Sequence, residues 1–216
     1  MGMRLWTISE LWPPASVPRT AYGKEYSSMS VTDAVDLHER AKNFLTEAEI
    51  ERFLQAAKSG RRGVRDQLMM LLMYRHGLRE TELCRMTVSC LDLETARLWV
   101  EPLKGSLSTH HPIEGDELRA IRRWLRLRDS RLPWLFVTER DGQFTRQGVY
   151  YLVRRIGERA ELSRVHPHML RHACGYALAN KGHDLRTIQD YLGHRDPNHT
   201  AIYTRTAAER FENLWH

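Results

Sequence analysis

The chain has 216 residues, and its 33 Lys and Arg against 27 Asp and Glu give a formal net charge of +6. With 42% hydrophobic and 28% charged residues it can bury a core, which excludes a disordered, collagen-like or coiled-coil protein. The longest apolar run, residues 68–74, is far shorter than the roughly 20 residues of a membrane-spanning helix, and residues 1–16 lack the apolar centre of a signal peptide. We therefore expect a cytoplasmic protein with no membrane role.

Helices are predicted for the first part of the compact region. Residues 1–42 carry three prolines and no sustained hydrophobic period, so we expect a tail or arm there. Thr46 and Glu49 form a Thr-x-x-Glu capping box, followed by apolar residues at helical spacing up to residue 57. A second, nearly all-apolar helix is predicted over residues 64–76 with Gly77 as its left-handed cap, and a third begins at Arg79.

The pattern changes to strands in the middle of the chain. Residues 87–93, 97–103 and 108–113 are rich in β-branched, aromatic and aliphatic residues and predict a small antiparallel sheet. Residues 116–128 return to helical spacing, with an arginine stripe opposite the apolar face: Arg119, Arg122, Arg123 and Arg126. That stripe suits a phosphate backbone, and it equally suits the solvated face of a surface helix.

Further helices are predicted over residues 147–160, 168–181, 185–192 and 206–214, separated at Gly182, Gly193 and Pro197. The fold class predicted from these elements is mainly α with a small antiparallel β-sheet, an α+β arrangement. The length suits one domain, for which we expect residues 43–216.

Nucleotide and metal cofactors are not expected. The chain has neither Gly-x-Gly-x-x-Gly nor Gly-x4-Gly-Lys-Ser/Thr, so no ATP-binding loop is visible. Histidines and a cysteine crowd between residues 166 and 174, which leaves a zinc site as an alternative. Arg171 stands between His168 and His172, however, and its cation would repel a metal ion held by both. Three cysteines without a C-x-x-C pair are most simply reduced thiols.

Five cationic or ionisable residues could form an anion site if the fold brings them together: Arg79, Lys104, His168, Arg171 and His194. Guanidinium forks match the paired oxygens of a phosphodiester. Each residue also has an ordinary explanation as a surface charge or a capping group. Spacing places His168 and Arg171 on one helix face and leaves the convergence of the others open.

Several motifs resemble those of the tyrosine recombinases, the phage integrase family. The matching segments are His-Pro-His-Met-Leu-Arg-His-Ala-Cys-Gly at residues 166–175, Ile-Gln-Asp-Tyr-Leu-Gly-His-Arg at 188–195 and His-Thr-Ala-Ile-Tyr-Thr at 199–204. Residues 77–83 resemble the family's upstream arginine motif, and Lys104 matches the position of its β-hairpin lysine. The resemblance covers residues 44–215, and within the family the motif sequences are most similar to those of the short fimbrial phase-variation invertases.

The resemblance implies a covalent mechanism on DNA. Tyr203 would attack the scissile phosphate, forming a 3′-phosphotyrosyl link and releasing a 5′-hydroxyl. Arg79 and Arg171 would hold the non-bridging oxygens and stabilise the transition state, a role that needs permanent cations. Exchange of one phosphodiester for another conserves bond energy and needs no nucleotide cofactor.

The remaining site residues would transfer protons, hydrogen-bond the phosphate or orient other site groups. His194 would donate a hydrogen bond to the phosphate oxygens, and Lys104 would protonate the leaving 5′ oxygen or, on another reading, contact the DNA backbone. His168 would take or orient the tyrosine proton, which is needed because free tyrosine has a pKa of about 10. Glu82 would orient the site or, on another reading, is an exposed charge on its helix. Tyr191 and Tyr176 are the other tyrosines near these motifs, and both have the pattern of core residues.

The resemblance also implies partners. These are double-stranded DNA with paired recombination sites, a homotetramer in the synaptic complex and possible accessory DNA-bending proteins at the nucleoid. Larger members have a separate N-terminal DNA-clamping domain, for which residues 1–42 are too few. The apolar segment 211–215 would dock on a neighbour or pack on its own chain. Inversion, integration and excision remain open as outcomes.

Three other classes of protein share some of these features. A DNA-binding regulator would share the charge and the helices without needing the full set of site residues. A type IB topoisomerase would share the cleavage chemistry but relax supercoils as its main product. A helical scaffold would need none of the set.

Overall fold

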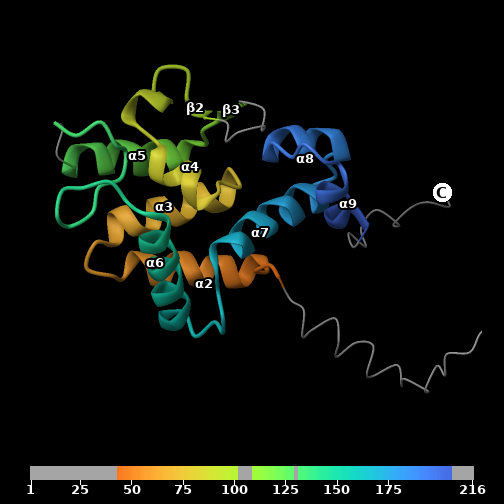
Figure 1. The fold of residues 1–216 in the computed structure, drawn as a ribbon, viewed down its shortest axis with the longest axis horizontal. Helices are drawn as coiled ribbons and strands as arrows, with labels where there is room; N and C mark the ends of the chain where they lie inside the picture. The colour runs from red at the N-terminus through yellow and green to blue at the C-terminus, as the bar shows by residue number, and fades with distance from the viewer. Residues whose placement is uncertain (1–42, 102–108, 129–130, 206–216) are drawn as a thin grey trace, which may run out of the picture. The chain divides into compact units, whose positions relative to one another are not determined.

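The computed structural model describes residues 43–101, 109–128 and 131–205, all within one compact unit, Lys42–His216. Helices dominate the described part and a single small sheet accompanies them, so the predicted fold class is confirmed (Figure 1). In chain order the elements are α2 (Glu47–Lys58), α3 (Gly63–Arg75), α4 (Glu80–Arg85), the 3-10 turn η2 (Val88–Cys90), β1 (Leu91–Asp92), β2 (Arg97–Val100), β3 (Thr109–Pro112), α5 (Gly115–Leu127), α6 (Arg146–Arg159), α7 (Pro167–Asn180), α8 (Leu185–Leu192) and α9 (Asn198–Arg205).

The first helices follow their local signals. The Thr46 side chain accepts from the backbone N–H of Glu49, and the Glu49 carboxylate accepts from the backbone N–H of Thr46, so the predicted capping box is present. Helix α3 is apolar on most of its surface because it is packed on several sides, by α2, α5 and α7. It ends before Gly77, whose φ of 58° is the left-handed conformation predicted for the cap.

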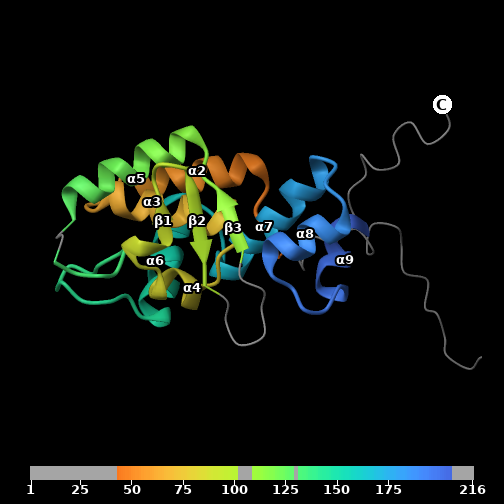
Figure 2. The same cartoon turned by 90° about the horizontal axis from the view of Figure 1, so that it is seen from above.

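The sheet is antiparallel with the strand order β1-β2-β3, and Figure 2 shows the three strands side by side with β3 on the side of α8. Leu98 pairs with His111, and Val100 pairs with Thr109. Strands β2 and β3 fall inside the predicted segments. The prediction of a strand over all of residues 87–93 is wrong, because Val88–Cys90 form a 3-10 turn before the short strand β1. The Val88 N–H donates to the carbonyl of Pro133, so a tertiary contact overrides β propensity there.

Helix α5 has the expected two faces. Its buried face holds Glu117, Ile121 and Trp124, and the predicted arginine stripe (Arg119, Arg122, Arg123 and Arg126) is exposed. The Trp124 Nε1–H donates to the carbonyl of Leu135 at 2.8 Å, which ties α5 to the loop that leads toward α6.

The C-terminal part differs from the prediction at one helix. Helix α8 has the predicted bounds, but α9 begins at Asn198, where no helix was predicted. The Asp196 carboxylate accepts from the N–H of Asn198, and the Pro197 carbonyl accepts from the N–H of Ala201, so Asp-Pro-Asn is a helix start rather than a break. The predicted helix 206–214, the segment 211–215 and residues 1–42 lie outside the described residues. No helix in the described ranges is long and apolar enough to cross a bilayer.

Candidate active site

Arg171 is the most deeply buried of the predicted site residues Arg79, His168, Arg171 and His194, which the structure describes. It lies on α7, which starts with Pro167 in its first turn, and the residue is 5% exposed. Its Nη1 donates to the carbonyl of Gly77 and its Nη2 to the carbonyl of Leu192. Burial, and then the nearby Arg79 cation, lower the pKa of Arg171 to about 10, which still leaves it charged at neutral pH. The guanidinium therefore joins the end of α3 to the end of α8.

Arg79 is held beside it by the turn at Gly77. Arg79 is the N-cap of α4; its N–H donates to Glu82 Oε2 at 2.7 Å, and its Nη1 donates to Glu82 Oε1 at 2.8 Å. Glu82 is 8% exposed, so a buried carboxylate fixes both the backbone and the side chain of Arg79. A Cβ at Gly77 would lie 2.4 Å from Leu192 Cδ2, so this close approach of α3 to α8 requires glycine.

Arg79 and Arg171 line one recess together. Its empty volume is about 250 Å³, and its wall also includes Glu82, Gly193 and the residues at the two ends of the segment between β2 and β3, Glu101 and Thr109. Lys104 belongs to that segment by sequence but lies outside the described residues.

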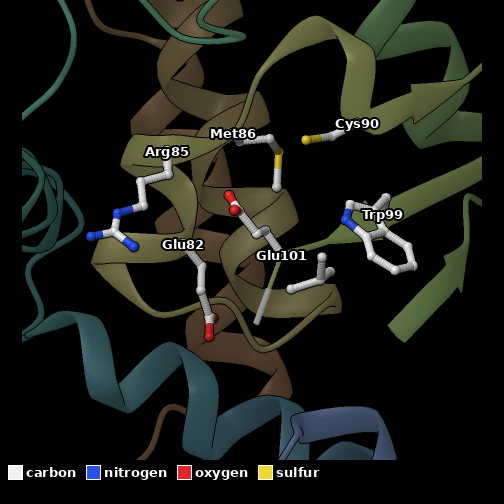
Figure 3. Close-up of a pocket in the computed structure, with 7 residues that line it drawn as sticks. Glu82, Arg85, Met86, Cys90, Trp99 and Glu101 are labelled. Atoms are coloured by element: carbon white, nitrogen blue, oxygen red, sulfur yellow. The ribbon is translucent and has the colours of Figure 1, made fainter. Parts of the chain in front are cut away.

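A neighbouring pocket shares Glu82, Val100 and Glu101 with this recess. It is lined by Arg85, Cys90 and Trp99 together with Glu82 and Glu101. Figure 3 shows the Glu82 carboxylate pointing away from Arg85, Cys90 and Trp99. This orientation agrees with its two hydrogen bonds to Arg79. Glu82 thus lies between the two pockets, and its carboxylate faces the recess of Arg79 and Arg171.

His194 follows the αL residue Gly193, which ends α8 with φ of 63°. Its Nδ1 and the Thr200 hydroxyl form a hydrogen bond of 2.8 Å, which links the loop to α9. Burial, and then Arg171 and Arg79, lower the pKa of His194 to about 3. The ring is therefore neutral at pH 7, and it stacks against the Tyr203 ring with centroids 6.3 Å apart.

Tyr203 lies on α9 and is 1% exposed. A Cβ at Gly175 would lie 2.6 Å from the Tyr203 ring, so the missing side chain of Gly175 makes room for it. The edge of Tyr176 packs against the same ring with a centroid distance of 5.1 Å. Burial raises the pKa of the Tyr203 hydroxyl to about 12, although the nearby Arg171 lowers it in part. The phenol is therefore protonated at rest and needs an acceptor for its proton before it can react.

His172 forms the hydrogen bond with that hydroxyl. Its Nδ1 lies 2.9 Å from Tyr203 Oη. Burial, and then the neighbouring His168 and Arg171, lower the pKa of His172 to about 4, so the ring is neutral at pH 7 and can hydrogen-bond the phenol, although the lowered pKa makes it a weak base. From the sequence, His168 was predicted for this role and His172 was a candidate metal ligand. In the structure His168 is exposed on the preceding turn of α7. The contact with Tyr203 spans 31 residues, and no local pattern signals it.

The other chemistry-bearing residues near these motifs have ordinary contacts. Tyr191 donates a hydrogen bond to the carbonyl of Arg75 at 3.0 Å. Cys174 is buried, and burial raises the pKa of its thiol to about 12. Within the described ranges no three His, Cys, Asp or Glu side chains come together in a metal-binding arrangement.

The arrangement offers a defined set of chemical groups. Two fixed guanidinium groups face one recess, a neutral histidine lies beside them at the end of α8, and a buried phenol packs against that histidine while bonded to a second neutral ring. Such a site can bind an oxyanion through the arginines and supply a hydroxyl nucleophile with a proton acceptor.

Comparisons with known proteins agree with this chemistry. The model of the phage integrase family matches residues 43–210. The chain is 42% identical over 181 residues to the type 1 fimbriae regulatory protein FimB of Escherichia coli (strain K12), covering 82% of this chain and 90% of that protein. It is 36% identical over 168 residues to the tyrosine recombinase XerA of Thermococcus onnurineus, covering 76% of this chain and 58% of that one.

Solved structures share the fold. The crystal structure of XerA recombinase matches with a TM-score of 0.68 and 30% identity, over 74% of this chain and 58% of that chain. XerH site-specific recombinase, bound to a palindromic difH substrate in a post-cleavage complex, matches with a TM-score of 0.68 and 26% identity, over 79% of this chain and 52% of that chain.

Proposed function

The chain belongs to the phage integrase family and is a tyrosine recombinase, and from this we propose that it cuts and rejoins DNA at specific sites through a covalent link between Tyr203 and a 3′ phosphate. The Tyr203 oxygen attacks phosphorus, the bond from phosphorus to the 5′ oxygen breaks, and a 5′-hydroxyl leaves. In the second half of the reaction a 5′-hydroxyl of the partner strand attacks the phosphotyrosine and releases the tyrosine.

The observation that carries the proposal is the shared recess of Arg79 and Arg171. A pentacoordinate phosphoryl transition state places extra charge on its non-bridging oxygens, and two fixed guanidinium groups stabilise that charge better than mobile surface cations. His194 is neutral, so it serves as a hydrogen-bond donor to the same oxygens and adds no third charge.

Proton transfers complete the roles. His172 accepts or orients the Tyr203 proton in the arrangement described, while His168, exposed on the same helix, remains a candidate for this task once DNA is bound. Lys104 donates the proton to the departing 5′ oxygen. The arginines neutralise the phosphate, so we expect cleavage to proceed in EDTA and without ATP.

We propose that the biological outcome is inversion of a DNA segment. The support is the similarity to FimB and FimE of Escherichia coli, fimbriae regulatory proteins of which this chain covers 90% and 91%. The partners of the reaction are then two inverted DNA sites, four copies of the chain and accessory DNA-bending proteins in the cytoplasm. Residues 1–42 remain a predicted tail, and residues 43–216 a predicted catalytic domain.

A covalent trap tests the cleavage step. Inverted-repeat duplexes from the DNA around the chain's own gene, nicked beside the candidate cleavage site, lose the short 5′-hydroxyl fragment and trap the adduct. Wild type should give a protein–DNA band resistant to detergent, and Tyr203→Phe should give none while still binding the duplex. Tyr176→Phe is the matched control, since that ring packs edge-on against Tyr203, and it should still form the adduct. Binding without an adduct in wild type would favour a DNA-binding regulator.

A plasmid with two inverted sites tests the outcome. Wild type should flip the intervening segment, which a junction-specific amplification detects. Relaxation of the plasmid without inversion would favour topoisomerase-like activity. A second plasmid carries the same two sites as direct repeats, and excision from it without inversion of the first would contradict the proposed outcome.

A further inference from the structure

A buried polar chain runs behind the recess and has no part in the roles assigned above. Its members are Glu117 on α5, His76 at the end of α3, and His111 and Thr109 on β3. The first three are 1%, 2% and 1% exposed. We call this set the relay. Two of its members, His76 and Thr109, line the same recess as Arg79 and Arg171.

The contacts along the relay are continuous. Glu117 Oε1 lies 3.1 Å from His76 Nε2, His76 Nδ1 lies 3.2 Å from His111 Nδ1, and His111 Nε2 lies 2.7 Å from the Thr109 hydroxyl oxygen. Tyr191 of α8 stacks on the His111 ring with centroids 3.9 Å apart. The relay therefore connects helices α3, α5 and α8 to the strand that follows the segment carrying Lys104.

The protonation of His111, the middle ring of the relay, follows from its surroundings. Burial, and then the neighbouring His76, lower the pKa of His111 to about 3, so its ring is neutral and carries one proton. A neutral imidazole has one donor nitrogen and one acceptor nitrogen, so His111 donates in one of its two contacts, with His76 Nδ1 or with the Thr109 hydroxyl, and accepts in the other. Glu117 Oε1 and His76 Nε2 lie within ion-pair distance, and neither atom has a hydrogen-bond partner in the described part of the chain.

The Glu117 carboxylate at the start of the relay is buried, and Arg75 Nη1 lies 3.4 Å from its Oε2. A set of apolar side chains could fill the same volume, but it would not fix the rotamer of Thr109. The hydrogen bonds from His76 to His111 and from His111 to Thr109 do fix it, because each ring orientation restricts the next. The relay thus fixes the side-chain orientation of Thr109 at the wall of the recess.

We propose that the relay is a positioning device for the leaving-group side of the reaction: it anchors Thr109, and with it the end of the β2–β3 hairpin, against the recess of Arg79 and Arg171. The proposal rests on the proposed function. Thr109 pairs with Val100 in the last register position of the hairpin, and Lys104 lies between these two residues in the sequence. The relay residues touch no reacting atom, so they are positioning residues.

The test compares two nicked duplexes that differ at one atom. One has the ordinary 5′ oxygen at the cleavage site, and the other a 5′-bridging sulfur, whose thiolate leaves without a proton. Thr109→Val removes the last hydroxyl of the relay without changing its shape, and His111→Phe keeps an aromatic ring against Tyr191. Thr109→Ser restores the hydroxyl. His110→Phe is the matched control, since His110 is the exposed neighbour on β3 and its ring packs at a tilt against Trp99 instead.

We expect Thr109→Val and His111→Phe to cleave the ordinary duplex at least about 10-fold more slowly than wild type, because small misplacements of a reacting group are costly. Both should return to within about threefold of wild type on the sulfur duplex. Thr109→Ser and His110→Phe should remain close to wild type on both. A general loss of folded protein would slow both reactions equally, so the ratio of the two rates separates positioning from stability.

Two results would overturn the proposal. If Thr109→Val cleaves the ordinary duplex at the wild-type rate, or is equally slow on both duplexes, the relay does not position the leaving-group side, although the recombinase assignment stands. If wild type forms no covalent adduct on either duplex, the proposed function fails and this inference fails with it.

Discussion

Arg171 should be a structural residue as well as a catalytic one, so Arg171→Ala should destabilise the fold. Its two hydrogen bonds satisfy the carbonyls of Gly77 and Leu192, and the side chain is 5% exposed. Each carbonyl left buried without a partner costs about 1 to 3 kcal/mol, so the loss should be roughly 4 kcal/mol. For a protein of this size, 1 kcal/mol lowers Tm by about 2 to 4 °C, which predicts a fall of roughly 12 °C.

Arg79→Ala supplies the comparison. In Arg79→Ala the buried Glu82 carboxylate loses the Arg79 side chain but keeps the backbone N–H of residue 79 as a partner, so the substitution should cost about 2 kcal/mol. Thermal unfolding followed by circular dichroism measures both variants without DNA. Both should lose cleavage activity, and only Arg171→Ala should also lose most of its stability. Equal Tm values for the two variants would refute the assignment of Arg171 as the link between α3 and α8.

Three further predictions concern protons. His172→Phe should slow adduct formation more than His168→Phe does, because His172 contacts the Tyr203 hydroxyl and His168 is exposed; the reverse order on nicked DNA would return the role to His168. Burial lowers the pKa of His111 and His194 to about 3 and that of His172 to about 4. Below the ordinary histidine pKa of about 6.5 the unfolded chain therefore binds more protons than the folded chain, so Tm should fall as the pH drops from 6.5 toward 4. A flat Tm over that range would contradict the burial of neutral rings. Lys104→Ala should cleave ordinary DNA roughly 10²- to 10⁴-fold more slowly and recover on the 5′-bridging sulfur duplex, whereas an unrescued defect that weakens at low salt would make Lys104 a backbone contact.

Sequence patterns predicted the elements whose signals are local. The capping box at Thr46 and the αL glycines Gly77 and Gly193 act within a few residues, so the ends of α2, α3 and α8 were close to those found. The start of α9 was missed because Pro197 was interpreted as a break, while the capping Asp196 before it marks a helix start. The turn at residues 88–90 depends on the carbonyl of Pro133, which is distant in sequence.

The same distinction applies to the site. The motifs named Arg79, Arg171, His194 and Tyr203, and the fold brings them together around α7 and α8. The contact of His172 with the tyrosine was not predicted, because its partner lies 31 residues away and only the packing of α9 on α7 makes the contact. The relay could not be predicted either, since His76 and His111 lie 35 residues apart on different elements and each is an ordinary histidine in its own segment.

The central claim is that Tyr203 carries the DNA, and identification of the modified residue tests it most directly. The trapped adduct is digested with nuclease and protease, and tandem mass spectrometry locates the residue that bears the nucleotide phosphate. We expect a single modified peptide with the 3′-phosphate on Tyr203. A phosphate on Tyr191, Tyr176 or a serine would contradict it, as would the absence of any nucleotide-linked peptide from DNA that the wild-type chain has cleaved.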